Sequence, residues 1–428
     1  VILDQPESHG TPGAQNTVFE ENIGPTIDAV SHSPPVPEVN QSIKVSARIS
    51  DPDGIATARL HYSVSGGAFQ VVPMAEGSEP GVWSGQIPGA SSGTKIQFYV
   101  EATDSSGAGV SATFPAAGAE SRAMVQVADG RDSNSRQNLR IIMTNADSSA
   151  LHNSNDLLHN RRLGCTVITN ERDIAYDCGI RLRGSMFSRR SAGGTGLNIK
   201  FPADSKFRGI HKTITTRTSG RIEILAKHII NHAGGIHDNY NDVVQLIHST
   251  QIGPSRLSMA RFGQPYLRGL AGGSGTDGTV FKMEGIREFQ GTTDGSPESQ
   301  KTPFPIGWIS SFDIADQGDD KEIYRHNMRI NGNFAKDDYS SIIAMCKAFS
   351  LTGQELEDAV AETIDVDKWM RQFALLSLLG IGDTYTQGNP HNLNMFVRPS
   401  DGLVEPMPWD WDFMFNRSTS SGLWGSRN

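Results

Sequence analysis

Apolar and polar residues alternate strictly along the N-terminal third of the chain. In residues 25–128, apolar side chains recur at every second position, for example at Ile43, Val45 and Ala47. A period of two predicts β-strands that bury one face. We therefore expect an all-β sandwich here, after a linker or the end of a preceding domain at residues 1–24.

Turn sequences separate about seven short strands within about 100 residues, which is the size of an immunoglobulin-like sandwich. The first of these turns, Asp51-Pro-Asp-Gly54, holds two carboxylates. Because it lacks a longer series of oxygen ligands, we interpret it as a turn and not as a calcium site. The stretches Ile49–Gly54 and Phe98–Asp104 resemble the immunoglobulin-like and fibronectin-III-like spacer modules of bacterial surface proteins.

Helical spacing appears after a polar boundary at residues 129–138. Apolar residues then repeat with the period of amphipathic helices at Arg221–Ala233, Tyr339–Phe349, Thr352–Val360 and Trp369–Leu376. Strands precede most of these helices along the chain. Residues 139–428 therefore read as a larger α+β domain, with a mixed N-terminal lobe and a helical C-terminal lobe.

Charge and hydropathy narrow the classes of function. The chain has 38 Lys and Arg residues against 47 Asp and Glu residues, a net charge of −9, and the charges are interspersed. A surface that coats nucleic acid is therefore not expected. No run approaches the roughly 18 apolar residues of a membrane helix, so we expect no membrane span. The chain begins at Val1 without Met or a signal-peptide pattern, and we interpret it as a processed form or a fragment.

Three cysteines exclude a disulfide-dense scaffold. The segments Gly164–Thr169 and Ile174–Cys178 read as two strands around a four-residue turn, which places Cys165 opposite Cys178. Directly opposed β-carbons lie about 4.5–5.5 Å apart, near enough that a modest adjustment allows a disulfide. A disulfide and a pair of buried thiols are both open interpretations.

The most chemical information lies between the last predicted helix and the C-terminus. A turn at Pro399–Gly402 folds the strands beside it into a hairpin, which places Asn392 opposite Trp409 and beside Asp410. Asp383 leads into the same end of the hairpin. A few carboxylate and amide oxygens suit a Mg²⁺ ion that carries the phosphates of a nucleotide. In the alternative interpretation, Asp383 caps a turn and the later carboxylates pair with arginines.

The order of these parts is the order used by protein kinases: a catalytic-loop Asp, an Asn, a short hairpin and a metal-binding Asp. The elements His391-Asn392, Pro408–Asp412, Arg181–Ser185 and Asn198–Phe201 resemble the CotH (spore coat protein H) kinase family, over residues 139–428. The resemblance implies a two-lobed, atypical, protein-kinase-like fold. It also implies a secreted or cell-surface bacterial kinase that transfers the γ-phosphate of Mg-ATP to a Ser or Thr hydroxyl of a protein substrate.

Carried over by position, the resemblance gives each matching residue a role. Asp383 is the expected catalytic Asp, Asn392 and Asp410 are the expected Mg²⁺ ligands, and Asp412 is a second-metal or supporting carboxylate. The other expected nucleotide-binding residues are the strand lysine Lys200, its ion-pair partner Glu223, the phosphate-binding arginines Arg183, Arg189 and Arg190, and Glu284 at the hinge that meets adenine.

Alternatives remain for the nucleotide lobe. Lys200 also reads as a solvated edge lysine, and Glu223 as half of a surface ion pair. The lobe departs from the family pattern, because Ser191–Gly196 replaces a Pro-Lys-Lys run and Thr213–Thr216 replaces a Trp. A second hypothesis is therefore a catalytically inactive adhesion or scaffold protein, whose partners are surface or extracellular-matrix proteins.

Overall fold

The computed structural model divides the chain into two compact units. The first comprises Val1–Asp132, Arg140–Thr144 and Gly164–Cys178, and the second comprises Ser133–Leu139, Asn145–Leu163 and Gly179–Asn428. The structure describes residues 20–107, 109–131, 137–153, 159–184, 189, 196–217, 220–248, 251–260, 262–270, 278–296, 299, 302, 306–310, 313–385, 392–411 and 414–415. The protein is multidomain and rich in sheet. The domain boundary placed between residues 128 and 139 stays a prediction.

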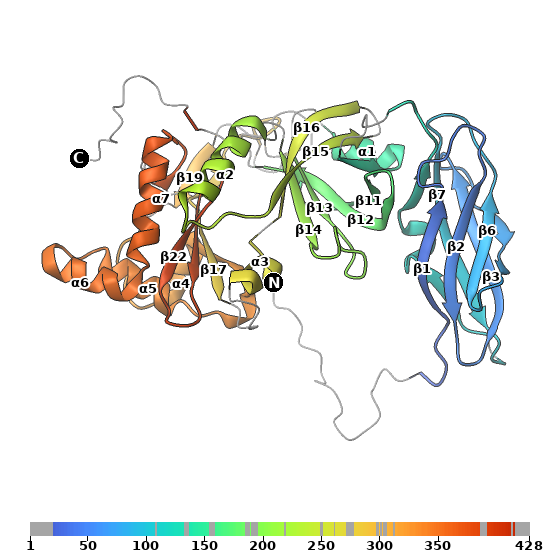
Figure 1. The fold of residues 1–428 in the computed structure, drawn as a ribbon, viewed down its shortest axis with the longest axis horizontal. Helices are drawn as coiled ribbons and strands as arrows, with labels where there is room; N and C mark the ends of the chain where they lie inside the picture. The colour runs from blue at the N-terminus through green and yellow to red at the C-terminus, as the bar shows by residue number, and fades with distance from the viewer. Residues whose placement is uncertain are drawn as a thin grey trace. The chain divides into compact units, whose positions relative to one another are not determined.

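The first unit contains two antiparallel sheets around one core (Figure 1). One sheet has the order β1 (Thr26–Ser33), β2 (Ile43–Ser50), β6 (Val82–Ile87) and β5 (Ala75–Glu76). The other has the order β4 (Gln70–Pro73), β3 (Ile55–Val64), β7 (Lys95–Asp104) and β8 (Ser111–Phe114), with β9 (Ala123–Gln126) also on β7. The core is formed by alternate residues of both sheets, such as Val45, Leu60 and Phe98. The period of two predicted these strands because each of them buries one face.

The turn interpretation of Asp51-Pro-Asp-Gly54 is confirmed. The N–H of Asp53 donates to Oδ1 of Asp51 at 2.8 Å, and the N–H of Gly54 donates to the Asp51 carbonyl at 3.1 Å. Gly54 has φ of +84°, which glycine adopts without steric cost.

Strands β10 (Asn138–Ile142), β11 (Leu163–Thr169) and β12 (Asp173–Arg183) contribute residues to both units. Cys165 and Cys178 lie on β11 and β12 as buried thiols that no disulfide joins, so the second of the two interpretations holds. Burial raises the pKa of the Cys178 thiol, and the neighbouring Cys165 and Asp177 raise it further. The Cys178 thiol is therefore a poor nucleophile in the folded chain.

The second unit combines strands and helices. Its first strands, from residue 179 onward, are hydrogen-bonded neighbours in the order β12, β13 (Gly196–Lys200), β14 (Thr213–Arg217), β16 (Gln251–Ala260) and β15 (Asn241–His248). Helix α2 (Gly220–Ala233) follows β14 and confirms the helix predicted from Arg221 to Ala233. Shorter elements are α1 (Asn145–Leu151), α3 (Gln264–Leu270), the pair β18 (Ile286–Phe289) and β19 (Ile306–Ser310), and the turn η2 (Phe334–Lys336).

A four-stranded sheet carries the C-terminal half of this unit. Its order is β20 (Met328–Gly332), β17 (Thr279–Met283), β21 (Leu393–Val397) and β22 (Val404–Pro408). One face packs through Phe281, Leu393 and Met395 on the helices. These helices are α4 (Lys321–Asn327), α5 (Ser340–Ala348), α6 (Gly353–Thr363) and α7 (Val366–Leu378), gathered beside the sheet in Figure 1.

The three helices predicted after residue 335 are confirmed as α5, α6 and α7. In the part of the chain that the structure describes, no helix is both long enough and apolar enough to cross a membrane.

Candidate functional site

The C-terminal hairpin has the predicted register. Strands β21 and β22 pair down to Leu393 opposite Pro408. One further step places Asn392 opposite Trp409, with Asp410 directly after it. The two polar residues therefore stand at the same end of the hairpin, because the turn fixes the pairing of every later residue.

Asp383 reaches this end of the hairpin from helix α7. Gly380, with φ of +60°, ends the helix, and the N–H of Ile381 donates back to the Leu376 carbonyl at 3.1 Å. This glycine-based ending turns the chain away from the helix axis. Nδ2 of Asn392 then donates to the backbone carbonyl of Asp383 at 2.9 Å and to its Oδ2 at 3.3 Å. The predicted convergence of Asp383 and Asn392 is thus present in the structure.

Both predicted metal ligands of the hairpin have left-handed backbone. Asn392 has φ of +57° and Asp410 has φ of +65°. Asn and Asp adopt this region more readily than other side-chain-bearing residues do. Left-handed residues often occur where a side chain must be aimed at a functional site, so two of them at the same end of one hairpin are consistent with such a site.

Asp410 lies against an arginine that the sequence analysis did not select. Arg217, the last residue of β14, forms an ion pair with Asp410 and contacts Oε2 of Glu223 at 3.3 Å. Glu223 is 2% exposed and stands in the first turn of α2. One guanidinium therefore lies between two carboxylates from different elements.

The predicted ion pair between Lys200 and Glu223 does not form. Lys200 pairs with Thr213 at one end of the β13–β14 ladder, whereas the same register continued places Gly196 opposite Arg217 at the other end. Four residues of strand separate the two ends by about 13 Å. Lys200 is exposed there, and Glu223 is held by Arg217, which stands at the correct end.

A second buried cation lies beside Asp410. Nζ of Lys227 on α2 donates to Oδ1 of Asp238 at 2.5 Å, and both residues line a cavity of about 10 Å³ together with Glu223, Trp409 and Asp410. Burial raises the pKa of Asp238, and Lys227 opposes that rise. The cavity is about the size of one water molecule.

Arg183 reaches the same end of the hairpin, whereas the described contacts of Arg189 lie elsewhere. Its guanidinium carbon lies 5.6 Å from the centre of the Trp409 ring, within the range of a cation–π contact. Arg189 is buried and donates to the Gly184 carbonyl at 2.8 Å and to the His159 carbonyl at 3.2 Å, so it supports the local backbone. Arg190 and Asp412 lie outside the described residues.

Glu284 makes backbone contacts within the chain, and its expected role at the adenine hinge stays a prediction. It follows β17 directly, as predicted, but its N–H donates to the Asn327 carbonyl at 2.8 Å. Its carbonyl accepts from Nδ2 of Asn327 at 3.1 Å. The N–H of Glu284 is therefore used within the chain, its carbonyl keeps one acceptor site, and the Glu284 side chain pairs with Lys282.

The carboxylates at and beside Asp410 are of the type that binds Mg²⁺. Oδ1 of Asp410 and Oε2 of Glu223 are buried, and in the structure both lie against the Arg217 guanidinium, which a metal would have to displace. Within the ranges that the structure describes, no three acidic, His or Cys side chains form a group that could hold a metal. Mg²⁺ commonly takes only one or two carboxylates and completes its shell with phosphate oxygens and water. The donor set therefore fits an ion that arrives with a nucleotide.

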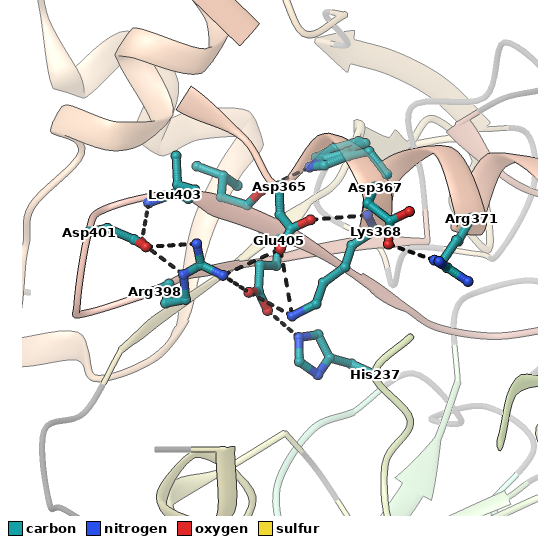
Figure 2. Close-up of polar contacts among 11 residues, drawn as sticks. His237, Asp365, Asp367, Lys368, Arg371, Arg398, Asp401, Leu403 and Glu405 are labelled. Atoms are coloured by element: carbon teal, nitrogen blue, oxygen red, sulfur yellow. Dashed lines mark hydrogen bonds and ion pairs between the residues drawn. The ribbon is translucent and has the colours of Figure 1, made fainter. Parts of the chain in front are cut away.

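A charged network, which the sequence analysis also missed, fixes the other end of the hairpin (Figure 2). Glu405 in β22 is 2% exposed and accepts from His237, from Lys368 on α7 at 2.7 Å and from Arg398 at 3.0 Å. Arg398 also pairs with Asp365, the residue before α7, at 3.3 Å. The network joins β22 to α7 and to the segment after α2.

Burial raises the pKa of the Glu405 carboxyl, but hydrogen bonds from His237 and Lys368 outweigh burial and bring the pKa down to about 2. A sequence signal was present, because Glu405 interrupts an otherwise apolar strand, Val404–Pro408. A charge in a buried strand requires partners.

Residues 303–426 match the family model described as CotH kinase protein. Asp383, Asn392 and Asp410 fall within the match, so the resemblance to the CotH kinase family is confirmed for this stretch, and the family implies use of ATP. No curated protein matches the chain.

Among solved structures, the chain is similar at 10% identity to the cycloalternan-forming enzyme from Listeria monocytogenes in complex with a pentasaccharide substrate. The alignment covers 55% of this chain and 18% of that one, with a TM-score of 0.18. The chain thus spans less than a fifth of that enzyme's length, and the score is too low to support a shared fold.

Proposed function

We propose that this protein is an atypical kinase that transfers the γ-phosphate of Mg-ATP to a Ser or Thr hydroxyl of a protein. The observation that carries the proposal is the hydrogen-bonded pair of Asp383 and Asn392 at the end of a hairpin whose other strand leads into Asp410. The CotH match over residues 303–426 supports it. These parts follow one another in the order used by known phosphotransferases.

The roles follow from the chemistry of each group. Asp383 orients the acceptor hydroxyl and accepts its proton while the hydroxyl oxygen bonds to the γ-phosphorus and the bond to the bridging β-γ oxygen breaks, which releases ADP. Asn392 fixes the Asp383 carboxylate through Nδ2 and presents its amide oxygen as a metal ligand beside Asp410. Mg²⁺, when bound, neutralises charge on the phosphates.

Transfer of the γ-phosphate tests the proposal directly. With labelled ATP and a Ser/Thr-containing protein acceptor, we expect Asp383→Asn to lower the rate at least 100-fold, because a positioned base contributes about 10²–10⁴. Asp367→Asn is the matched control, since Asp367 is exposed on the preceding helix and pairs only with Arg371 among the described ion pairs. Equal rates for the wild type and Asp383→Asn contradict the proposal.

One observation favours a second function, a catalytically inactive scaffold. Asp410 is already neutralised by Arg217, and the cavity beside it is only about 10 Å³. Ligand-dependent stability separates the two functions, because a ligand at 100 times its Kd stabilises a binder by about 2.7 kcal/mol. A shift in melting temperature with Mg-ATP supports the kinase, and its absence supports the scaffold.

The location and the first unit also belong to this proposal. We place the protein outside a bacterial cell, secreted or on the surface, with a surface or matrix protein as its substrate. Two packed antiparallel sheets with one shared core support an immunoglobulin-like spacer module for the first unit.

A further inference from the structure

Two arginines stand in one row of the β12–β13–β14 sheet with a glycine between them. Arg183 pairs directly with Gly196, and the β13–β14 register continued from Asn198 and Thr215 brings Gly196 opposite Arg217. Residues directly opposite one another in a sheet point to the same face. Arg183 and Arg217 therefore project on the same side, about 10 Å apart at the backbone across two strand spacings.

The glycine lets strand β14 approach β13 closely between the two arginines. A β-carbon at Gly196 would lie 2.3 Å from the Thr216 carbonyl oxygen and 3.7 Å from the Cα of Arg217. No other residue fits there without moving the strand. Gly196 is therefore required by the close approach of β14, and no side chain stands between the two arginines in this row.

Both arginines also meet the candidate site. Arg183 lies over the Trp409 ring at 5.6 Å, and Arg217 forms the ion pair with Asp410, the next residue. Guanidinium groups recognise phosphate oxygens by paired hydrogen bonds, and these two contact adjacent residues of the hairpin. Glu223 holds Arg217 from behind at 3.3 Å.

We infer that Arg183 and Arg217 form a clamp for the polyphosphate of a nucleotide, and that Arg217 takes the place given to Lys200. The inference rests on the proposed kinase function and adds the cation that receives the phosphates. In the protein without ligand, Asp410 pairs with Arg217. A phosphate that binds Arg217 must therefore compete with Asp410. A metal bound at Asp410 would leave Arg217 available to the phosphates.

This competition predicts that removal of the Asp410 charge raises the affinity of the protein for polyphosphate. Inorganic tripolyphosphate, in EDTA, is the probe, and binding to the full chain is followed by thermal shift and by tryptophan fluorescence. We expect Asp410→Asn to bind tripolyphosphate about tenfold more tightly than the wild type, because it frees Arg217 and removes a repelling charge. We expect Arg217→Gln and Arg183→Gln to bind about tenfold more weakly or worse.

The controls separate the clamp from folding and from the kinase proposal. Lys200→Gln removes a cation at the far end of the same strands and should leave tripolyphosphate affinity unchanged. If Arg217→Gln fails to fold, Arg183→Gln alone decides, since Arg183 packs on Trp409 near the surface. A Trp409→Phe variant identifies the fluorescence signal among the six Trp residues.

Each outcome has one meaning. If Mg-ATP stabilises the wild type but Asp410→Asn gains no affinity for tripolyphosphate, or if Lys200→Gln is the variant that loses it, the clamp is wrong and the kinase proposal stands. If Mg-ATP has no effect while the variants change tripolyphosphate affinity as expected, the clamp is a phosphate site and the kinase proposal fails.

Discussion

Three cations surround Trp409 and Asp410, and each comes from a different element: Arg183 from β12, Arg217 from β14 and Lys227 from α2. Local spacing predicted Asp383 and Asn392, because only a short loop separates them. It did not predict Arg217, because a strand-terminal arginine is usually solvated and only the strand register brings it to the hairpin. Lys200 lies on β13, the neighbour of the strand that carries Arg217, and at the opposite end of the ladder that joins the two strands.

Glu405 provides a pH test at this scale. Its folded pKa of about 2 lies below the ordinary value of 4.5, so its contribution to stability is complete above pH 4.5 and is lost as the pH falls towards 2. A shift of this size corresponds to about 3 kcal/mol. We expect Glu405→Gln to lower the free energy of unfolding by about that amount at pH 7.

The loss of unfolding free energy caused by Glu405→Gln should shrink steadily between pH 4.5 and pH 2. Urea denaturation of the wild type and the variant at each pH measures it. Glu355→Gln, at an exposed position on α6, is the control and should stay within about 0.5 kcal/mol. If the difference in unfolding free energy between the wild type and Glu405→Gln does not change with pH, the ionised Glu405 carboxylate is not the source of the stabilisation.

Thiol titration tests the cysteines. All three are buried, burial raises the pKa of Cys178 and Cys346, the latter to about 12, and the thiolate is the reactive form. We expect a thiol reagent to label none of the three rapidly in the native protein and all three after denaturation without reductant. A single labelled cysteine in the denatured protein would instead identify a disulfide between Cys165 and Cys178.

At the scale of elements, α7 anchors the hairpin that carries the site. Trp369 is fully buried in α7, and its Nε1 donates to the Val404 carbonyl in β22 at 2.9 Å. The sequence predicted both elements, since a helical period and a turn signal are local features. The sequence did not predict that Trp369 joins them, because such a contact depends on how the helix docks.

Trp369→Phe removes the donor and leaves a smaller ring. We expect the free energy of unfolding to fall by about 2–3 kcal/mol, from the cavity and the unsatisfied carbonyl. ATP-dependent stabilisation should weaken with it, because the hairpin loses its support. Met370→Ala, at a 53% exposed position on the same helix, should change stability by less than about 0.5 kcal/mol. If Trp369→Phe and Met370→Ala lower the free energy of unfolding equally, α7 does not anchor the hairpin through Trp369.

At the scale of the whole molecule, the two units have separate cores. The first is built from alternating strand residues such as Leu60, and the second from the sheet and helices around Trp369. Proteins of this kind commonly unfold in more than one transition. Calorimetry should therefore resolve at least two transitions, of which only one responds to Mg-ATP.

Core substitutions assign the transitions. Leu60 is 0% exposed, and a buried Leu→Ala change costs about 2–5 kcal/mol. Leu60→Ala should therefore lower one transition and leave the nucleotide-responsive one in place, whereas Trp369→Phe should lower the nucleotide-responsive transition alone. If either substitution lowers every transition together, the units fold as one cooperative body, and the phosphate site depends on the whole chain rather than on the second unit.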